Sequence, residues 1–353
     1  TFSQLLNWRV TASVGVGYVP FLGYGWGSAL DVSTVRVLQP PFYALTTNGV
    51  GVSILNRSLP GTAFTFTGEI QNVNTTLFGA RSIEQLIAGF VDRCLQSNPS
   101  VSSCTTQRDT LRQQLLRTKD GDSLLGALRF GAAFDRRDSA FNPTRGWYVG
   151  ATAELLRVLS VSEEDQNLAR TTLHLSGRAS LYTRVTSGGT VLLTSLRVGR
   201  NLTLFGTQPN THPSRLFWLG GADSMRGWLQ NQMVPQDVAD SALALAQNDR
   251  DRRLLGANGS EFFWNLVVDL RVPLGICVTN GVCLALGLFC DIGNLWSRPP
   301  GLDELYRARF SPGFGLRTTS PFGIISLDVG FNPLYRAYIQ EQLWALQFSL
   351  GSV

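Results

Sequence analysis

The sequence predicts an all-β fold, a transmembrane antiparallel β-barrel that occupies residues 1–353, and three observations support this prediction. Charged residues make up only 16% of the chain, whereas soluble domains usually contain roughly 25%. No run of about 18 or more apolar residues occurs, so no transmembrane helix is expected. Apolar and polar residues instead alternate along many short segments, as in strands that face lipid on one side and the barrel lumen on the other.

The alternation is clearest in the last third of the chain. Between Trp264 and Leu274 every even position is apolar, while the odd positions include Asn265, Asp269 and Arg271. The polar faces of these segments are rich in glycine, serine and alanine, and the apolar faces in leucine and aromatic residues. A soluble sandwich would carry many charges on its outer face, so a lipid-facing exterior fits better. The same split recurs in 284–293, 309–317, 325–331 and 344–351.

Eight further strands are predicted upstream of a long polar segment, residues 203–260. With the five downstream strands, the sequence predicts about thirteen. A closed single-chain bacterial barrel normally has an even number of strands. Either some strands escape the pattern, or the barrel begins upstream of Thr1. The eight upstream segments are 4–19, 24–38, 44–57, 62–73, 123–137, 145–157, 170–183 and 190–203.

Residues 75–121 depart from the strand pattern. Ile83 and Ile87 recur at helical spacing, and so do Leu111 and Leu115. We therefore predict a partly helical insertion in a loop between two strands.

The connections between strands predict the orientation of the barrel. Ser320–Gly323 reads as a tight turn, whereas 296–307 and 203–260 are long. Short turns of such barrels face the periplasm and long loops face the outside. The long loop and the 75–121 insertion are therefore expected outside the cell, and the C-terminus in the periplasm.

Composition argues against several other classes of function. The formal net charge of +5 comes almost wholly from arginine, with Lys119 the only lysine. The sequence has no cluster of basic residues of the kind that binds a phosphate backbone. Nucleic acid is therefore not an expected partner. The two histidines, His174 and His212, and the lack of a Cys-x-x-Cys leave a zinc site without ligands. Ser224 does not lie in a nucleophile elbow, so neither an enzymatic activity nor a cofactor is expected.

The cysteines are suited to disulfides in an oxidising compartment. Cys94 and Cys104 lie close together in the insertion, and Cys277 and Cys283 flank Val-Thr-Asn-Gly-Val. Each spacing fits a small disulfide loop, although sequence alone does not determine connectivity. Cys290 would then remain as a strand residue.

The long segment 203–260 contains the stretch Arg215–Trp228, which reads RLFWLGGADSMRGW. A loop this long inside a compact domain is usually functional or disordered. The adjacent glycines Gly220 and Gly221 and the Arg-Gly step after Met225 indicate a loop with a fixed internal shape. What this loop packs against is therefore expected to determine the function.

Five motifs, in order along the chain, resemble the BamA-like superfamily of outer-membrane assembly and translocation barrels. Together they cover roughly residues 123–353. Met225 stands where the family more often has valine, and Trp228 where it has phenylalanine or tyrosine. The motifs are the inter-strand link Asp138–Gly146, the loop motif Arg215–Trp228, the Phe-x-Asp-x-Gly wall motif within Phe289–Trp296, the strand-turn-strand Ser311–Gly330 and the closing strand Gln347–Gly351.

The resemblance implies a barrel of sixteen strands, of which residues 1–121 would hold the fourth to seventh. Periplasmic docking domains, called POTRA, are expected before the barrel, and none is recognisable in this sequence. The closing strand of the family usually ends on an aromatic residue, so one residue beyond Val353 is expected.

By the resemblance, the loop tip folds into the lumen against the wall that carries Asp291 and Gly293. The strand alternation independently places Asp291 on the polar face. A buried arginine is costly unless it is paired, and a guanidinium–carboxylate contact is geometrically specific. We therefore predict an ion pair between Arg226 and Asp291. The tip residues concerned are Gly220, Gly221, Met225, Arg226, Gly227 and Trp228.

The resemblance also predicts a function. The barrel would be the core of an outer-membrane protein assembly machine of the BAM complex type, located in the outer membrane of a Gram-negative bacterium. It would fold and insert client β-barrel proteins through a lateral gate beside the closing strand, which contains Phe348 and Gly351. Expected partners are client outer-membrane proteins, accessory lipoproteins and the lipid bilayer.

Two other functions stay open at this point. A two-partner-secretion-type pore, which exports a partner protein, shares every motif quoted, and the number of upstream POTRA domains would separate the two. A passive porin is the third alternative, but it would not need the Arg226 motif.

Overall fold

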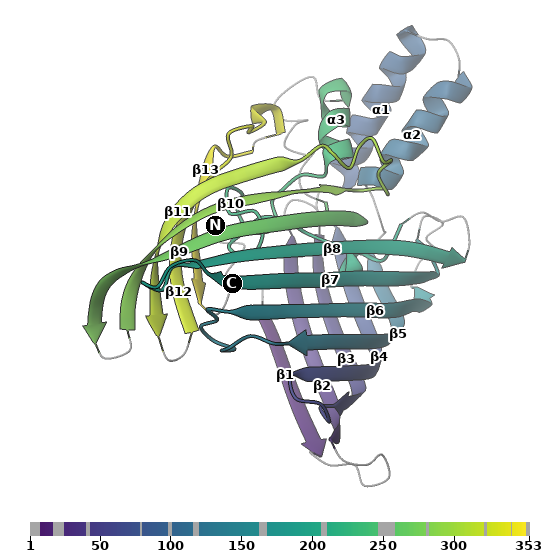
Figure 1. The fold of residues 1–353 in the computed structure, drawn as a ribbon. Coiled ribbons are helices and arrows are strands. Elements are labelled where there is room, and N and C mark those ends of the chain that lie inside the picture. The colour runs from purple at the N-terminus through teal and green to yellow at the C-terminus, as the bar shows by residue number, and fades with distance from the viewer. Residues whose placement is uncertain are drawn as a thin grey trace.

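The computed structural model describes residues 8–16, 25–39, 43–77, 80–97, 101–115, 120–161, 168–205, 210–245, 258–279, 282–320, 323–339 and 341–350. In these ranges thirteen strands form one antiparallel sheet whose strand order follows the chain (Figure 1). The predicted all-β fold is confirmed, with eight strands before the long loop and five after it. The strands are β1 (Trp8–Val16), β2 (Trp26–Gln39), β3 (Tyr43–Asn56), β4 (Thr62–Leu77), β5 (Gly121–Asp135), β6 (Gly146–Val161), β7 (Thr171–Arg184), β8 (Val191–Phe205), β9 (Phe262–Thr279), β10 (Val282–Trp296), β11 (Arg309–Ser320), β12 (Gly323–Phe331) and β13 (Trp344–Leu350).

Several strands extend beyond the segments in which the alternation is strict. β9 runs to Thr279, although its strict alternation ends at Leu274. β4 reaches Leu77, although its predicted segment ends at residue 73. A ladder continues wherever a neighbouring strand supplies backbone partners, and apolar side chains are not needed for this. Within the described residues β1 pairs with β2 and β13 pairs with β12, so these two strands end the strand order.

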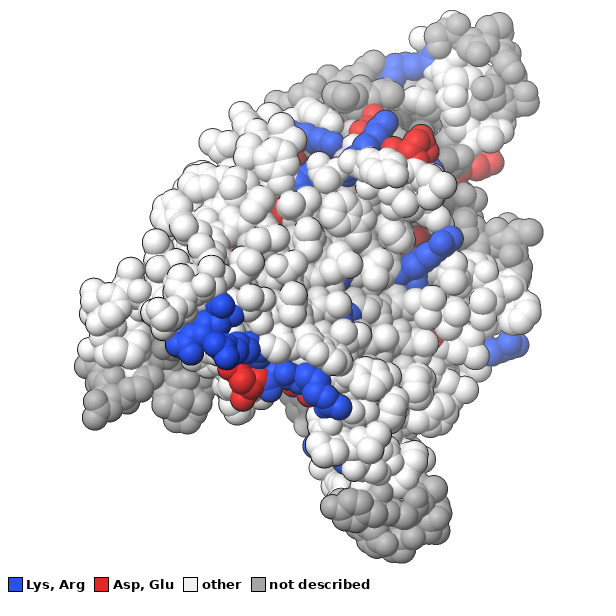
Figure 2. Space-filling model, viewed as in Figure 1, with Lys and Arg blue, Asp and Glu red and all other residues white. Residues whose placement is uncertain are grey.

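The side chains of the C-terminal strands alternate between an exposed apolar face and a buried polar face. On β10, Leu288 is exposed while Asp291 is buried, and on β12 Leu327 is exposed while Asp328 is buried. Figure 2 shows that charged side chains are sparse over the strand-covered face. An apolar exterior around a polar interior is the arrangement of an outer-membrane barrel.

Successive antiparallel strands run in opposite directions, so their connections alternate between the two ends of the sheet, and the longest connections all lie at one end. The long ones join β4 to β5, β8 to β9 and β10 to β11, while β9–β10 and β11–β12 are joined within a few residues. β13 ends on the side of the short connections. The periplasmic location of that side stays a prediction.

The insertion between β4 and β5 contains two helices, α1 (Ala80–Ser97) and α2 (Val101–Leu115). A disulfide between Cys94 and Cys104 joins them. A second disulfide, between Cys277 and Cys283, links β9 to β10, and Cys290 is a free thiol on β10. None of the helices in the described ranges is long and apolar enough to cross a membrane.

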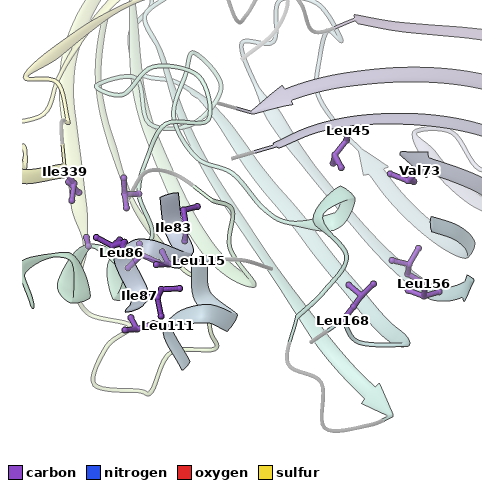
Figure 3. Packing of buried hydrophobic residues seen from close by; sticks show 14 of the residues in the cluster. Leu45, Val73, Ile83, Leu86, Ile87, Leu111, Leu115, Leu156, Leu168 and Ile339 are labelled. Carbon is purple, nitrogen blue, oxygen red and sulfur yellow. The ribbon is translucent and has the colours of Figure 1, made fainter. Parts of the chain in front are cut away.

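A hydrophobic cluster joins the helical insertion to the strand ends and to the long loop. Figure 3 shows Ile83 and Ile87 of α1 gathered with Leu111 and Leu115 of α2, and Ile339 lies beside them. The same cluster includes residues of β3 to β6 and of α3 (Gln236–Leu245), a helix of the long loop that the sequence did not predict. Apolar burial therefore holds the loop at the end of the sheet that carries the long connections.

Candidate functional site

Residues 215–230 of the long loop fold back against the inward-facing side chains of the strands. Backbone hydrogen bonds close the tip: Gly221 N donates to Trp228 O at 3.0 Å, and Trp228 N donates to Met225 O at 3.1 Å. Gly220 and Gly221 adopt φ angles of 109° and 102°, which few other residues tolerate. The tip consequently has one defined shape.

Arg226 at the tip makes a bidentate contact with Asp291 of β10. Its Nε lies 2.9 Å from Asp291 Oδ2, and its Nη2 lies 2.6 Å from Oδ1. The backbone N of Arg226 also donates to Oδ2 at 3.0 Å. Both residues are buried, with exposed fractions of 1% and 0%. The structure thus brings together the two residues that the sequence paired.

Two further aspartates complete what we call the tip anchor, namely Arg226 with Asp269, Asp291 and Asp328. Arg226 Nη1 donates to Asp269 Oδ2 at 2.9 Å and to Asp328 Oδ2 at 3.2 Å. Arg317 of β11 donates to the same two carboxylates, at 2.5 Å and 3.4 Å. Three carboxylates therefore face two guanidinium groups, a formal charge of −1 within a buried cluster.

The loop tip also contacts Phe289 of β10 and Gln347 of β13. The guanidinium carbon of Arg226 lies 3.4 Å from the ring centroid of Phe289 on β10, a cation–π arrangement. Gln347 of β13 donates from Nε2 to Trp228 O at 2.8 Å and to Arg226 O at 3.3 Å. The tip therefore contacts the strand at the end of the strand order.

Two glycines let the tip and the wall approach closely, and a third lets two wall strands approach each other. A Cβ on Gly227 would lie 2.5 Å from Phe331 O, and a Cβ on Gly330 would lie 2.4 Å from the carbonyl carbon of Arg226. A Cβ on Gly293, the predicted wall glycine, would lie 2.6 Å from a backbone oxygen of β9. These separations are too short for any side chain, so glycine is required for the observed fit.

The two tip residues that depart from the family pattern are both buried. Met225 and Trp228 pack in a hydrophobic cluster with Phe217, Leu219, Met233, Phe263 and Leu295. Burying a large apolar side chain contributes roughly 1.5–3 kcal/mol. The larger side chains at these two positions therefore fill space beneath the tip and stabilise its docking.

Sequence reasoning missed several members of the site. Asp269, Arg317 and Asp328 all lie on the polar faces that the alternation identifies, but nothing in the alternation says that they share one level of the lumen. Phe289 and Gln347 were seen only as parts of motifs. Phe348 of the closing strand lies on the outer face with 68% of its surface exposed, and Gly351 lies outside the described residues.

The residues considered for metal or catalytic chemistry form hydrogen bonds within the fold. Within the described ranges no group of three His, Cys, Asp or Glu is arranged to hold a metal ion. The Ser224 hydroxyl accepts a hydrogen bond from Gly220 N at 3.0 Å. The Nδ1 atom of His174 lies 2.7 Å from Oδ1 of Asn201.

His212 is expected to make the docking of the loop depend on pH. It precedes the short η3 helix (Pro213–Arg215), and its Nδ1 accepts a hydrogen bond from Ser214 N at 3.3 Å. Complete burial lowers the His212 pKa from 6.5 to about 3. A released loop would bind a proton that the docked loop excludes, so docking is expected to weaken as pH falls below 6.5 toward about 3.

Proteolysis of the loop, measured from about pH 7 down to about pH 4, would detect this weakening. His212→Asn is the matched control, because asparagine also accepts a hydrogen bond at such a position and does not titrate there. The variant should lose the part of the pH dependence that His212 causes. An identical pH profile in both proteins would refute this role.

Comparison with known proteins gives the family. The family model for the Omp85 superfamily domain matches residues 9–353. None of the curated protein sequences matches the chain.

Two solved structures show a similar fold. A crystal structure of BamA from Haemophilus ducreyi that lacks POTRA domains 1–3 has a TM-score of 0.67 at 15% identity, over 98% of this chain and 62% of that chain. CdiB from Escherichia coli has a TM-score of 0.51 at 14% identity, over 96% and 51%. The chain thus spans less than two thirds of either protein. Since the family model covers nearly the whole chain, the resemblance seen in the motifs is confirmed, and the chain belongs to the Omp85 superfamily.

Proposed function

We propose that this barrel is the core of an outer-membrane assembly machine that folds and inserts client β-barrel proteins through a lateral gate at β13. The observation that carries the proposal is the contact between the loop tip and β13, a strand of seven residues that pairs with β12 and receives the tip through Gln347. The edge of such a strand offers backbone donors and acceptors on which an incoming strand can form.

The tip anchor supports the same proposal because it connects the loop to this edge. Gln347 of β13 holds the backbone of the tip, and the tip in turn is held by β9, β10 and β12. The loop would therefore keep the gate strand in register while clients exchange hydrogen bonds with it. Such an exchange needs no nucleotide or cofactor, and accessory lipoproteins are proposed partners.

Export of a partner protein is the second candidate. The observation that favours it is a lumenal cavity of about 640 Å³, bounded by β4 to β9 and by the loop. The similarity to the BamA and CdiB structures concerns the fold alone and does not discriminate between the two functions.

Vesicles that contain the full-length protein test the proposal. A urea-unfolded eight-stranded outer-membrane barrel is added, and its folding is followed by heat-modifiable gel mobility and by protease protection. We expect folding to be faster than in vesicles that contain an unrelated barrel of similar size. Equal rates in both, combined with passage of an unfolded secreted polypeptide across the vesicle wall, would reject insertion and favour export.

A further inference from the structure

The long loop has a second attachment, at its base, on the N-terminal part of the sheet. Arg215 forms an ion pair through Nε with Glu154 of β6 and donates from Nη2 to Gln71 of β4 at 2.9 Å. We call these three residues the base anchor. Two residues further on, Phe217 stacks on His174 of β7 with ring centroids 4.4 Å apart. The loop therefore connects strands β4 to β8 with strands β9 to β13.

The two anchors differ in what remains after the loop leaves. Glu154 also accepts a hydrogen bond from Arg129 Nε of β5 at 2.7 Å. If Arg215 leaves, Glu154 keeps its ion pair with Arg129, a partly exposed side chain that also lies 4.0 Å from Glu69. The side chain of Arg215 is already 12% exposed, so water can reach it.

At the tip anchor, departure of the arginine would leave an excess of buried negative charge. If Arg226 leaves, three buried carboxylates remain with Arg317 alone. Stranding a buried charge is strongly destabilising, whereas leaving a compensated pair is not. The charge balance therefore favours release of the base anchor over release of the tip anchor.

The base anchor lies beside the lumenal cavity of about 640 Å³. One side of this cavity is formed by Phe217 and Asp223 of the loop, and the other by inward-facing residues of β4 to β8. Small side chains leave the space open on the strand side, because they cannot reach across it. These include Gly131, Ala133 and Gly150.

We propose that the base anchor is the releasable contact of the loop, and that its release widens this cavity into a passage along β5 to β8 while the tip stays bound. Arg215 is thus a positioning residue that keeps the lumen closed. The inference deepens the proposed function, because it describes regulation of the same loop. It needs no client for its test, so its failure and the failure of client insertion are distinguishable.

Single-channel recording of the full-length protein in planar bilayers tests the proposal. In Arg215→Gln we expect the probability of the open state to rise about tenfold, as a population shift of about 1.4 kcal/mol produces. Arg129→Gln is the matched control, since the same carboxylate loses a guanidinium group but the loop stays attached. An unchanged open probability in Arg215→Gln, or an equal rise in Arg129→Gln, would overturn the proposal.

Thiol accessibility provides a second measurement. Ser176→Cys places a thiol on the cavity wall of β7, and Cys290→Ser removes the native free thiol. In this background a water-soluble maleimide should label position 176 faster when Arg215→Gln is added, and at the original rate when Arg129→Gln is added. Heat-modifiable mobility verifies that each variant is folded. Equal labelling rates among folded variants would also overturn the proposal.

Discussion

Arg226→Gln is expected to abolish most of the proposed assembly activity and to destabilise loop docking by about 3–5 kcal/mol, the usual cost of removing one partner from a buried ion pair. The variant leaves Asp269, Asp291 and Asp328 buried with a single guanidinium group, that of Arg317. The rate of client folding in vesicles and the protease resistance of the loop would measure the two effects.

The charge balance predicts an order among the variants of the tip anchor. Asp291→Asn should be milder than Arg226→Gln, because Arg226 keeps Asp269 and Asp328 at 2.9 and 3.2 Å. Adding Asp291→Asn to Arg226→Gln should restore part of the loss, because it removes one of the stranded carboxylates. A double-mutant cycle measures this coupling.

Arg298→Gln serves as the control for these variants. Arg298 pairs with Glu304 at 2.7 Å on the surface, with half of its side chain exposed, and such pairs contribute about 0–1 kcal/mol. Strictly additive effects at positions 226 and 291 would show that the two residues do not act together.

Gly330→Ala is expected to displace the loop tip and to reduce assembly nearly as much as Arg226→Gln. The added methyl group would lie 2.4 Å from the carbonyl carbon and 2.5 Å from the carbonyl oxygen of Arg226. These are backbone atoms of the anchored tip, so the tip has to move. Overpacking of this kind costs about 1–3 kcal/mol in well-packed interiors, and here the movement also lengthens the contacts of the tip anchor.

Gly177→Ala on β7 is the matched control for this substitution. A Cβ there would have its nearest neighbour at 3.7 Å, an ordinary contact, so client folding and protease resistance should stay close to those of the unsubstituted protein. If Gly330→Ala behaves like Gly177→Ala, the tip does not depend on the close approach of β12.

Much of the fold could be predicted because a strand records its two faces in adjacent residues. The alternation around Asp291 and Asp328 identified β10 and β12 and placed both carboxylates on the polar side. The helical spacing of Ile83 and Ile87 likewise identified α1. The helix α3 was missed because it lies inside a segment that the strand pattern classes as a long polar loop.

The candidate site was predicted only in part. The motif supplied Arg226, and the alternation supplied a carboxylate on the correct face. Which other carboxylates share that level depends on the register between strands, for example Asp269 opposite Phe289 and Asp328 opposite Gly315. Register is set by turns and bulges throughout the sheet and is not recorded in any one strand.

The sequence by itself therefore determined the strands, their faces, the family and one ion pair of the loop, since each depends on neighbouring residues or on a contiguous motif. Only the tertiary structure decided that Arg226 meets three aspartates and that Arg215 reaches Gln71, 144 residues away. The physical reason is that these contacts form across the lumen. They depend on how strand register and sheet curvature bring distant segments to the same level of the lumen. Local sequence patterns specify neither the register nor the curvature.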